Sequence, residues 1–272
     1  MENKKDSLGD RVKELESLQA SACLDETQPI CVRIDGKSFH TYTKGLARPY
    51  DKRLSDLMVE TTNFLVEKTN AKLGYTQSDE ISLVYFKTED KQQNFFGGRI
   101  QKLTSVLASM ATAKFNKEIV KKIPEKVDSF AFFDCRVWNV PTLKDAAEVF
   151  IWRQEDAIKN AVSMAAHAHF SHKSVQGKSS RDKIEMLKEK GIIWEEYPEF
   201  FKSGTYSKRH LIEVPIPEEM KSFPANQGKE TFVRAEIINL HYPRLSRVED
   251  IENFLFKEDL NLSLNKKNKM KI

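Results

Sequence analysis

The stretch Gly74-Tyr-Thr-Gln-Ser-Asp-Glu-Ile-Ser-Leu-Val-Tyr-Phe86 decides the fold of this chain, together with Cys31-Val-Arg-Ile-Asp-Gly-Lys-Ser-Phe-His40. In each stretch an apolar, strand-like run adjoins acidic residues. One run ends at Asp35-Gly36, and the other begins directly after Asp79-Glu80. Mg²⁺ takes oxygen ligands and leaves room for phosphates, so carboxylates at strand ends beside a glycine suit this ion. The remaining sequence must therefore show whether these acids meet in space.

The order of the predicted elements places the acids at one edge of a sheet. Apolar periodicity predicts strands near 30–34, 73–77, 81–86 and 130–133, and helices near 52–70 and 94–119. This order is βαββαβ, the split ferredoxin-like unit. In that unit the first two strands run parallel and the third lies antiparallel between them, about 4.8 Å from each. Asp35 and Asp79 are then placed to hold one or two metal ions together. The plainer alternative is an acidic turn and a separate strand-end cap.

Length and composition restrict the class of protein. The 272 residues correspond to one large domain, or to one domain with an appendage. A net charge of +4 and a pI near 8.7 are compatible with nucleic-acid binding without being diagnostic. Three cysteines without a CxxC pattern favour a reducing compartment. Because neither a signal peptide nor a membrane-length apolar run is recognisable, we expect a cytoplasmic protein with no membrane partner. No GxxxxGKS or GxxxxGKT motif occurs, which excludes a P-loop.

The flanking segments predict further helices and strands. Residues 144–170 predict a long helix, and residues 211–214 and 231–240 predict two strands, with a loop over 217–230. The basic tail 265–272 is expected to fray. Residues 7–20 predict an amphipathic helix with four apolar side chains facing inward: Leu8, Val12, Leu15 and Leu18.

Basic residues and histidines outside the acidic stretches each have two interpretations. Arg48 precedes a helix start, where unpaired N–H groups are available to phosphate, and Arg99 and Lys102 add positive charge on the next long helix. Each is equally compatible with an ordinary solvated side chain. The basic segment beginning at His172-Lys173 suits either an RNA backbone or a solvated loop. Three closely spaced histidines follow no known zinc-binding pattern: His167, His169 and His172.

Four blocks of the sequence resemble the signature blocks of the tRNA(His) guanylyltransferase family. They are Val32-Arg-Ile-Asp-Gly-Lys-Ser-Phe-His40, Tyr75-Thr-Gln-Ser-Asp-Glu-Ile-Ser82, Phe133-Asp-Cys-Arg-Val137 and Trp152-Arg-Gln-Glu-Asp156. The resemblance spans about residues 28–210, in matching order. It implies an enzyme that adds nucleotides to the 5′ end of tRNA, in the direction opposite to ordinary polymerases. It also implies a palm like that of polymerases and nucleotide cyclases.

The resemblance further implies roles for individual residues. Two Mg²⁺ ions would be held by Asp35, Asp79 and the carbonyl of Gly36, with Glu80 as a further catalytic acid that orients Asp79 or a water. GTP and ATP are the implied substrates, with tRNA as the partner. The nucleotide-binding positions would be Asp35, Gly36, Lys37, Ser38, Phe39, His40, Ser78 and Asp79. The triphosphate-binding positions would be Arg48, Asp51, Arg99 and Lys102, and positions for RNA binding or activation would be Arg136, Asn160, His172 and Lys173.

One departure from the family pattern bears on specificity. Eukaryotic members carry HINNLYN after the WRQ block, whereas this chain has Ile158-Lys-Asn-Ala-Val-Ser-Met164, which retains only Asn160. The chain therefore resembles the shorter guanylyltransferase-like branch, whose members are similar to 3′–5′ RNA polymerases that repair 5′-truncated tRNAs. We expect template-dependent addition after ATP or GTP activates the 5′-phosphate. The alternative is a tRNA(His) guanylyltransferase that adds a single extra guanosine to histidine tRNA.

The resemblance and the element order together predict an α+β architecture. Residues 1–140 are expected to form the palm-like catalytic core with its N-terminal helix, and 141–272 a helical and hairpin extension packed on it as one compact unit. Family resemblance implies a homotetramer. Two rival functions stay open: a palm-type nucleotide cyclase, which would leave the WRQ-containing helix unexplained, and a catalytically silent RNA-binding module, which the intact Asp35 and Asp79 disfavour.

Overall fold

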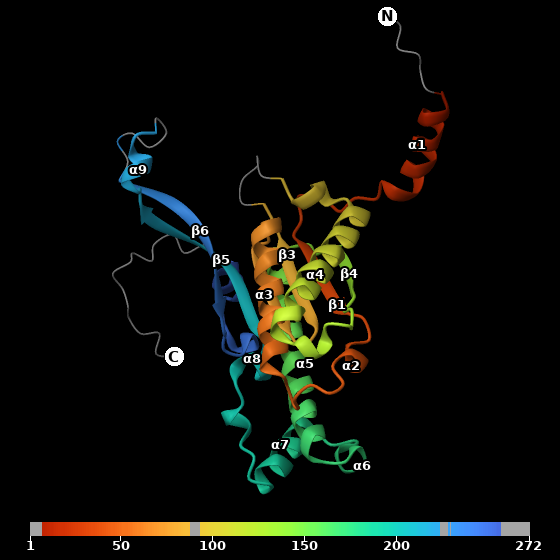
Figure 1. Cartoon of the computed structure of the whole chain (residues 1–272), viewed down its shortest axis with the longest axis vertical. Helices are drawn as coiled ribbons and strands as arrows, with labels where there is room; N and C mark the ends of the chain where they lie inside the picture. Colours follow the sequence, from red (N-terminus) through yellow and green to blue (C-terminus); the bar gives the residue numbers. More distant parts are fainter. Residues whose placement is uncertain (1–6, 88–92, 224–227, 229, 257–272) are drawn as a thin grey trace, which may run out of the picture.

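A computed structural model describes residues 7–87, 93–223, 228 and 230–256, and shows an α+β fold built around one six-stranded sheet (Figure 1). The tail 265–272 lies outside the described residues. The strands are β1 (Ile30–Gly36), β2 (Leu73–Gln77), β3 (Glu80–Tyr85), β4 (Phe133–Asn139), β5 (Thr205–Pro215) and β6 (Thr231–Leu240). The longer helices are α1 (Ser7–Ala20), α3 (Lys52–Thr69), α4 (Ile100–Lys122), α5 (Leu143–His169) and α7 (Ser180–Glu189). The short helices are α2 (Phe39–Tyr42), α6 (His172–Val175), α8 (Glu199–Lys202), α9 (Glu218–Lys221) and α10 (Ile251–Phe256).

The strand order confirms the predicted arrangement of the first three strands. The sheet runs β4-β1-β3-β2-β5-β6, and β3 is antiparallel to both β1 and β2. Asp35 lies opposite Glu80 in the β1–β3 register. The backbone N–H of Gly36 donates to the carbonyl oxygen of Asp79 over 3.1 Å. The end of β1 and the β2–β3 turn therefore share one edge, as the element order predicts.

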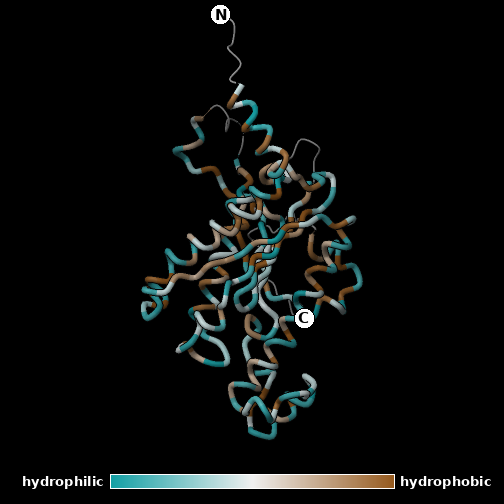
Figure 2. The backbone as a smooth tube through the Cα atoms, turned by 90° about the vertical axis from the view of Figure 1, so that its right-hand side faces the viewer, coloured by the Kyte–Doolittle hydropathy of each residue, from teal (hydrophilic) through white to brown (hydrophobic). Residues whose placement is uncertain are grey.

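Helices cover both faces of the sheet because β1 and β3 are apolar on both sides. Ile30, Val32 and Ile34 of β1 belong to a core cluster with α3 and α4, whereas Cys31 belongs to a second cluster with α5. This alternation follows the two-residue period of a strand. Figure 2 shows brown, hydrophobic segments along the strands that cross the middle of the molecule. A third cluster joins the second half of α5 to α7 and the aromatic segment 192–201 below the sheet.

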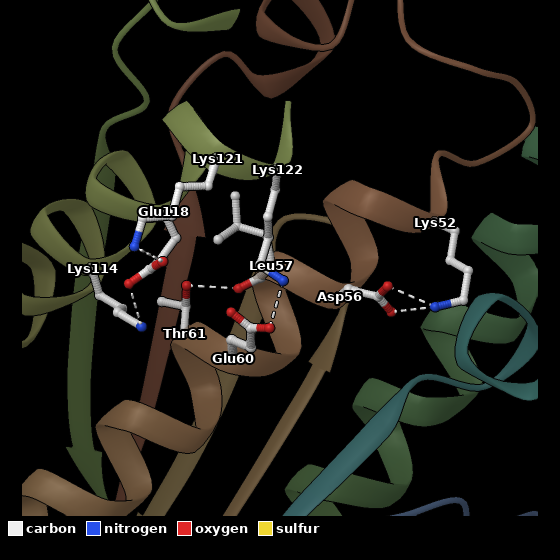
Figure 3. A network of polar contacts seen from close by, with 9 residues as sticks. All are labelled: Lys52, Asp56, Leu57, Glu60, Thr61, Lys114, Glu118, Lys121 and Lys122. Atoms are coloured by element: carbon white, nitrogen blue, oxygen red, sulfur yellow. Dashed lines mark hydrogen bonds and ion pairs between the residues drawn. The ribbon is translucent and has the colours of Figure 1, made fainter. Parts of the chain in front are cut away.

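One ion pair links α3 to α4 near the surface, and further ion pairs form within each helix (Figure 3). Lys122 of α4 contacts Glu60 of α3 at 2.5 Å, and Thr61 donates to the carbonyl of Leu57. Exposed pairs of this kind contribute about 1 kcal/mol or less. The packing of the two helices therefore depends mainly on their buried side chains, among them Leu57 and Leu107, which are fully buried.

The expected orientation of the first helix is wrong. The helix forms at Ser7–Ala20, but Leu8, Val12, Leu15 and Leu18 are between 53% and 70% exposed, and α1 contains no buried residue. Figure 1 shows the reason: α1 projects away from the body of the chain, so none of the helices and strands that the structure describes covers its apolar stripe. Among the described residues, no helix combines the length and the apolar character needed to cross a membrane.

The predicted boundaries of two core elements and of one loop are also wrong. The fourth strand runs over Phe133–Asn139 rather than 130–133, because pairing with β1 begins at Phe133 and leaves Phe130 exposed. Helix α4 begins at Ile100 rather than 94, because the positive φ angles of Phe96 and Gly97 interrupt the helical backbone within the 3₁₀ turn Phe95–Gly98. The segment 217–230, predicted to be a loop, contains the short helix α9.

Gly74 lies where β2 packs closely against α3, which predicts a stability defect for Gly74→Ala. An added Cβ would lie 2.7 Å from Val66 and 2.8 Å from Thr62. Overpacking of this kind costs about 1–3 kcal/mol, so thermal unfolding should show a lower melting temperature. Because Val66→Ala removes one of the clashing groups, the cost of Gly74→Ala should be smaller in that background. Equal stability of Gly74→Ala and the parent chain would contradict this close packing.

Candidate active site

A cavity of about 930 Å³ opens at the end of the sheet where the acids meet. Its wall is formed by the end of β1, the β2–β3 turn, the segment leading from α2 into α3, and the second half of α5. Ten of the residues selected from the sequence line this cavity: Asp35, Phe39, His40, Arg48, Asp51, Ser78, Asp79, Glu80, Asn160 and His172. The cavity thus gathers positions that lie more than 130 residues apart in the chain.

The Asp79 carboxyl, at the β2–β3 turn, lies in surroundings that disfavour its negative charge. Ser78 adopts a left-handed backbone conformation at the turn, with φ of 55°. Burial raises the pKa of the Asp79 carboxyl above its usual value, and the negative charge of Asp35 raises it further. Two nearby carboxylates in a partly buried site disfavour ionisation unless a cation lies between them.

Glu80 does not share this unpaired state, because Arg153 of α5 holds it. The Nε and Nη2 atoms of Arg153 donate to the two carboxylate oxygens of Glu80 at 2.5 and 2.7 Å. Both side chains are largely buried, with 11% and 18% exposure. Burial raises the pKa of Glu80 overall, although Arg153 opposes the shift. Asp35 and Asp79 are therefore the acids left to bind a cation.

The role of Arg153 was not predicted from the sequence. The WRQ block was recognised only as a family signature, whereas the structure gives each residue a partner. Gln154 is fully buried, donates to the carbonyl of Pro243 and accepts from the N–H of Leu245. An arginine and a glutamine next to each other in a predicted core helix were the available signal, since such residues are rarely buried without partners.

The donor set fits Mg²⁺. Asp35, Asp79 and the carbonyl oxygen of Gly36 are oxygen donors, and Mg²⁺ is usually bound through one or two carboxylates plus water and substrate phosphates.

Within the described residues, no three His, Cys, Asp or Glu side chains are grouped to hold a metal. His167 and His172 stack on each other at 5.5 Å between ring centroids.

The segment after β1 is fixed by an aromatic anchor. Phe39 is buried against Phe115 and Phe133. A Cβ on Gly36 would lie 2.2 Å from the Phe39 ring, so only glycine fits there. The N–H of Lys37 donates to a backbone carbonyl of the segment before β4 over 2.8 Å. Phe39 and His40 line the cavity, while Gly36, Lys37 and Ser38 do not contribute side chains to its wall.

The start of α3 places Arg48 and Asp51 at the cavity. Arg48 lies in the cavity wall and is exposed to solvent, so its side chain is accessible to a bound phosphate. Asp51 already caps α3, since its carboxylate accepts from the backbone N–H of Arg53 at 3.0 Å and from the Arg53 guanidinium at 2.7 Å. These bonds lower the pKa of Asp51. Asp51 thus caps α3 and also lies in the cavity wall beside Arg48.

Arg99 and Lys102 do not lie at this cavity. The backbone next to Arg99 pairs with residues 22–24, which precede β1, and the side chain of Lys102 lines a separate shallow depression with Gln101 and Thr104. Asn116, on the same helix, bonds the segment that leads into β4 near the acids. Because a helix rises 1.5 Å per residue, roughly 25 Å of α4 separates Arg99 from that end.

The four residues assigned to RNA binding or activation fall into two groups. Asn160 and His172 line the cavity, and Asn160 donates to Asp156 at 3.2 Å. Arg136 lies on β4 outside the cavity and pairs with Asp134 at 3.4 Å. Lys173 lies on α6 and also does not contribute to the cavity wall.

The raised pKa of Asp79 predicts that Asp79→Asn stabilises the chain when divalent cations are removed. The folded state favours the protonated carboxyl, so the parent chain loses stability as pH rises from the usual carboxyl pKa through the raised folded value. The melting temperature of Asp79→Asn in chelator should exceed that of the parent at neutral pH. The difference should shrink as the pH falls below this window.

A constant difference between the two melting temperatures at every pH would contradict the electrostatic origin. Asp128→Asn, at an exposed position outside the cavity, serves as the matched control and should leave the melting temperature unchanged.

Comparison with known proteins gives consistent similarities. The family profile described as tRNAHis guanylyltransferase matches residues 9–141. The tRNA(His) guanylyltransferase of Schizosaccharomyces pombe is 30% identical over 233 residues, which cover 80% of this chain and 87% of that enzyme. A bacterial tRNA(His) guanylyltransferase (Thg1)-like protein in complex with ATP is 36% identical, with a TM-score of 0.75, over 92% of this chain and 99% of the other. A bacterial Thg1-like structure in complex with GTP gives 34% identity and a TM-score of 0.71 over 92% of this chain and 100% of the other.

Proposed function

Because this chain belongs to the tRNA(His) guanylyltransferase family, we propose that it is a nucleotidyltransferase that adds nucleotides to the 5′ end of tRNA. The observation that carries the proposal is the meeting of Asp35 and Asp79 at a cavity of about 930 Å³. Arg48, His40 and Ser78 line the same cavity and supply charge and hydrogen-bonding groups for a nucleoside triphosphate. The complexes of bacterial Thg1-like proteins with ATP and GTP support these two nucleotides as substrates.

The proposed catalytic core is a palm like that of polymerases and nucleotide cyclases. The support is the βαββαβ order, with the acids on β1 and on the β2–β3 turn. Asp35, Asp79 and the Gly36 carbonyl would hold two Mg²⁺ ions. When bound, these ions would lower the pKa of the attacking hydroxyl and would neutralise negative charge on the leaving group. Arg153 engages both carboxylate oxygens of Glu80, which leaves Asp35 and Asp79 for the ions.

The proposed reaction has two stages. A 5′-monophosphate is a poor electrophile, so its oxygen first attacks the α-phosphate of ATP or GTP, which releases pyrophosphate. The 3′-hydroxyl of the incoming nucleotide then attacks the activated 5′-phosphate and displaces the nucleoside monophosphate. Phe39, His40 and Ser78 position the incoming nucleotide, and Arg48 neutralises its triphosphate. In-line positioning and charge neutralisation are the main contributions that proteins make to phosphoryl transfer.

Arg99 and Lys102 fit the triphosphate role only if a second copy of the chain supplies them. Within one chain they lie at the far end of α4 from the acids. We therefore propose that the active form is a homo-oligomer, a tetramer by family resemblance, in which these residues enter the cavity of a neighbouring subunit. A cytoplasmic location is part of the same proposal, since three free cysteines suit a reducing compartment.

Template-dependent repair is the favoured form of the activity. Ile158 does not line the cavity, and Ala161 is fully buried in the third core cluster, so neither position offers a polar group to a particular tRNA. Asn160 and Ser163 are the polar residues of this stretch that line the cavity. Because the acids and Arg48 contact groups common to all nucleotides, selection of the added base must come from pairing with the opposite strand. The 36% identity to a bacterial Thg1-like protein supports this branch.

The shared-site proposal predicts complementation between two inactive variants. Asp35→Ala should lower nucleotide addition by several orders of magnitude because a metal-binding carboxylate is lost. Arg99→Ala should impair use of the triphosphate. A mixture allowed to exchange subunits should regain activity, because about a quarter of randomly formed sites combine an intact acid with an intact arginine. Mixtures no more active than the sum of the separate variants would show that Arg99 does not act across subunits.

The repair proposal predicts the products formed on 5′-shortened tRNAs. With Mg²⁺ and nucleoside triphosphates, a tRNA lacking its first 5′ nucleotide should be extended with the nucleotide that pairs with the template base, and addition should stop when the acceptor stem is full. Changing the template base should change the added nucleotide. Sequencing of the 5′ ends measures both outcomes. Guanosine addition to full-length histidine tRNA alone, with truncated tRNAs ignored, would establish the histidine-tRNA alternative instead.

A further inference from the structure

Trp152 is an exposed aromatic side chain on a helix that is otherwise used for packing. It is 55% exposed, whereas Phe150 and Gln154, two positions to either side, are fully buried. The guanidinium carbon of Arg153 lies 4.3 Å from the centroid of the Trp152 ring. One contact therefore fixes the ring on an arginine, while more than half of the side chain remains open to solvent.

This ring lies next to the proposed reaction centre. Arg153 contacts the Trp152 ring and also donates two hydrogen bonds to Glu80, which lies opposite Asp35 in the sheet. The ring is thus separated from the catalytic edge by a single arginine side chain. A base resting on Trp152 would lie beside the cavity rather than inside it, because Trp152 is not among the cavity-lining residues.

Two further arginines lie on the same side of the sheet. Arg33 and Arg136 are cross-strand partners on β1 and β4. Neighbouring residues of Arg33 point into the α3–α4 core, so Arg33 points to the α5 face, and its partner Arg136 does the same. The Nε of Arg33 is buried without a hydrogen-bond partner among the described residues. Arg136 pairs with Asp134 at 3.4 Å and the charge of Arg33 acts on Glu80, so the Nε of Arg33 is the donor of this pair that is left for a further acceptor.

We propose that Trp152, backed by Arg153, is a stacking platform for an unpaired base of the tRNA strand opposite the growing 5′ end, with Arg33 and Arg136 near the phosphates of that strand. The inference rests on the proposed function. A 5′ end that is being extended is recessed, so the opposite strand necessarily carries unpaired bases at the reaction centre. Aromatic rings combined with arginine are the usual means of holding such bases.

The surroundings of Trp152 favour RNA over a second protein chain as its occupant. Arg153, Glu80 and Asp156 are charged residues connected to the platform through ion pairs. Charged residues are depleted at the core of protein interfaces, whereas arginine beside an exposed aromatic ring is common where bases stack.

The test compares Trp152→Ala and Trp152→Phe with Phe223→Ala in the full chain. Phe223 is exposed to nearly the same extent, 56%, but follows α9 on the β5–β6 hairpin, away from the acids. The substrates are 5′-shortened tRNAs with intact unpaired bases, and the same tRNAs with abasic sites at the unpaired positions of the 3′ strand other than the template position. Binding is measured separately by filter retention, and nucleotide addition by KM and kcat.

With intact tRNA, Trp152→Ala should raise Kd and KM about 10-fold, because loss of base–aromatic stacking costs this much, while kcat changes little. Trp152→Phe should restore most of the affinity, and Phe223→Ala should match the parent chain. With abasic tRNA, Trp152→Ala should have no further effect. Equal losses on intact and abasic tRNA, unchanged Kd, or a smaller oligomer in Trp152→Ala would overturn the platform. Failure of the parent chain to extend any tRNA would instead overturn the proposed function.

Discussion

The antiparallel pairing of β1 with β3 is the constraint on which the site depends. It places Asp35 opposite Glu80, and the Gly36 N–H bond to the Asp79 carbonyl closes the same edge. A slip of one residue would turn every side chain of β1 to the other face and would remove Asp35 from the cavity. A slip would carry Ile30, Val32 and Ile34 out of the α3–α4 core and would place the charged Arg33 there instead, which disfavours it. Core packing on β1 therefore also fixes the position of Asp35 in the site.

Helix α5 links that core to the chemistry. Its buried side contributes Ala147 and Phe150 to the second core cluster, and its next turn contributes Arg153 to Glu80. This ion pair neutralises one of the clustered acids, while Asp35 and Asp79 keep an unfavourable concentration of negative charge. That charge destabilises the free protein and favours binding of cations. Functional sites often show this conflict between stability and function.

The sequence predicted most of what depends on local pattern and little of what depends on distant partners. The arrangement of the first three strands and the edge shared by Asp35 and Asp79 followed from periodicity and known topology. The orientation of α1 did not, because a stripe of leucines predicts a buried face without showing what covers it. The Arg153–Glu80 pair joins positions 73 residues apart, so the sequence shows an arginine in a core helix without showing its partner. Family resemblance assigned Arg99 and Lys102 to the triphosphate. Their residue types do not show that they lie at the start of α4, at the end of the helix that is far from the acids.

The central claim is that Asp35 and Asp79 jointly bind the catalytic cation. The most direct measurement uses Mn²⁺ in place of Mg²⁺, with GTP, in crystals of this protein, and locates the metal by anomalous diffraction. The account predicts metal in contact with both carboxylates, and loss of that signal in Asp79→Asn. Metal bound elsewhere in the cavity, or an unchanged signal in the variant, would contradict it.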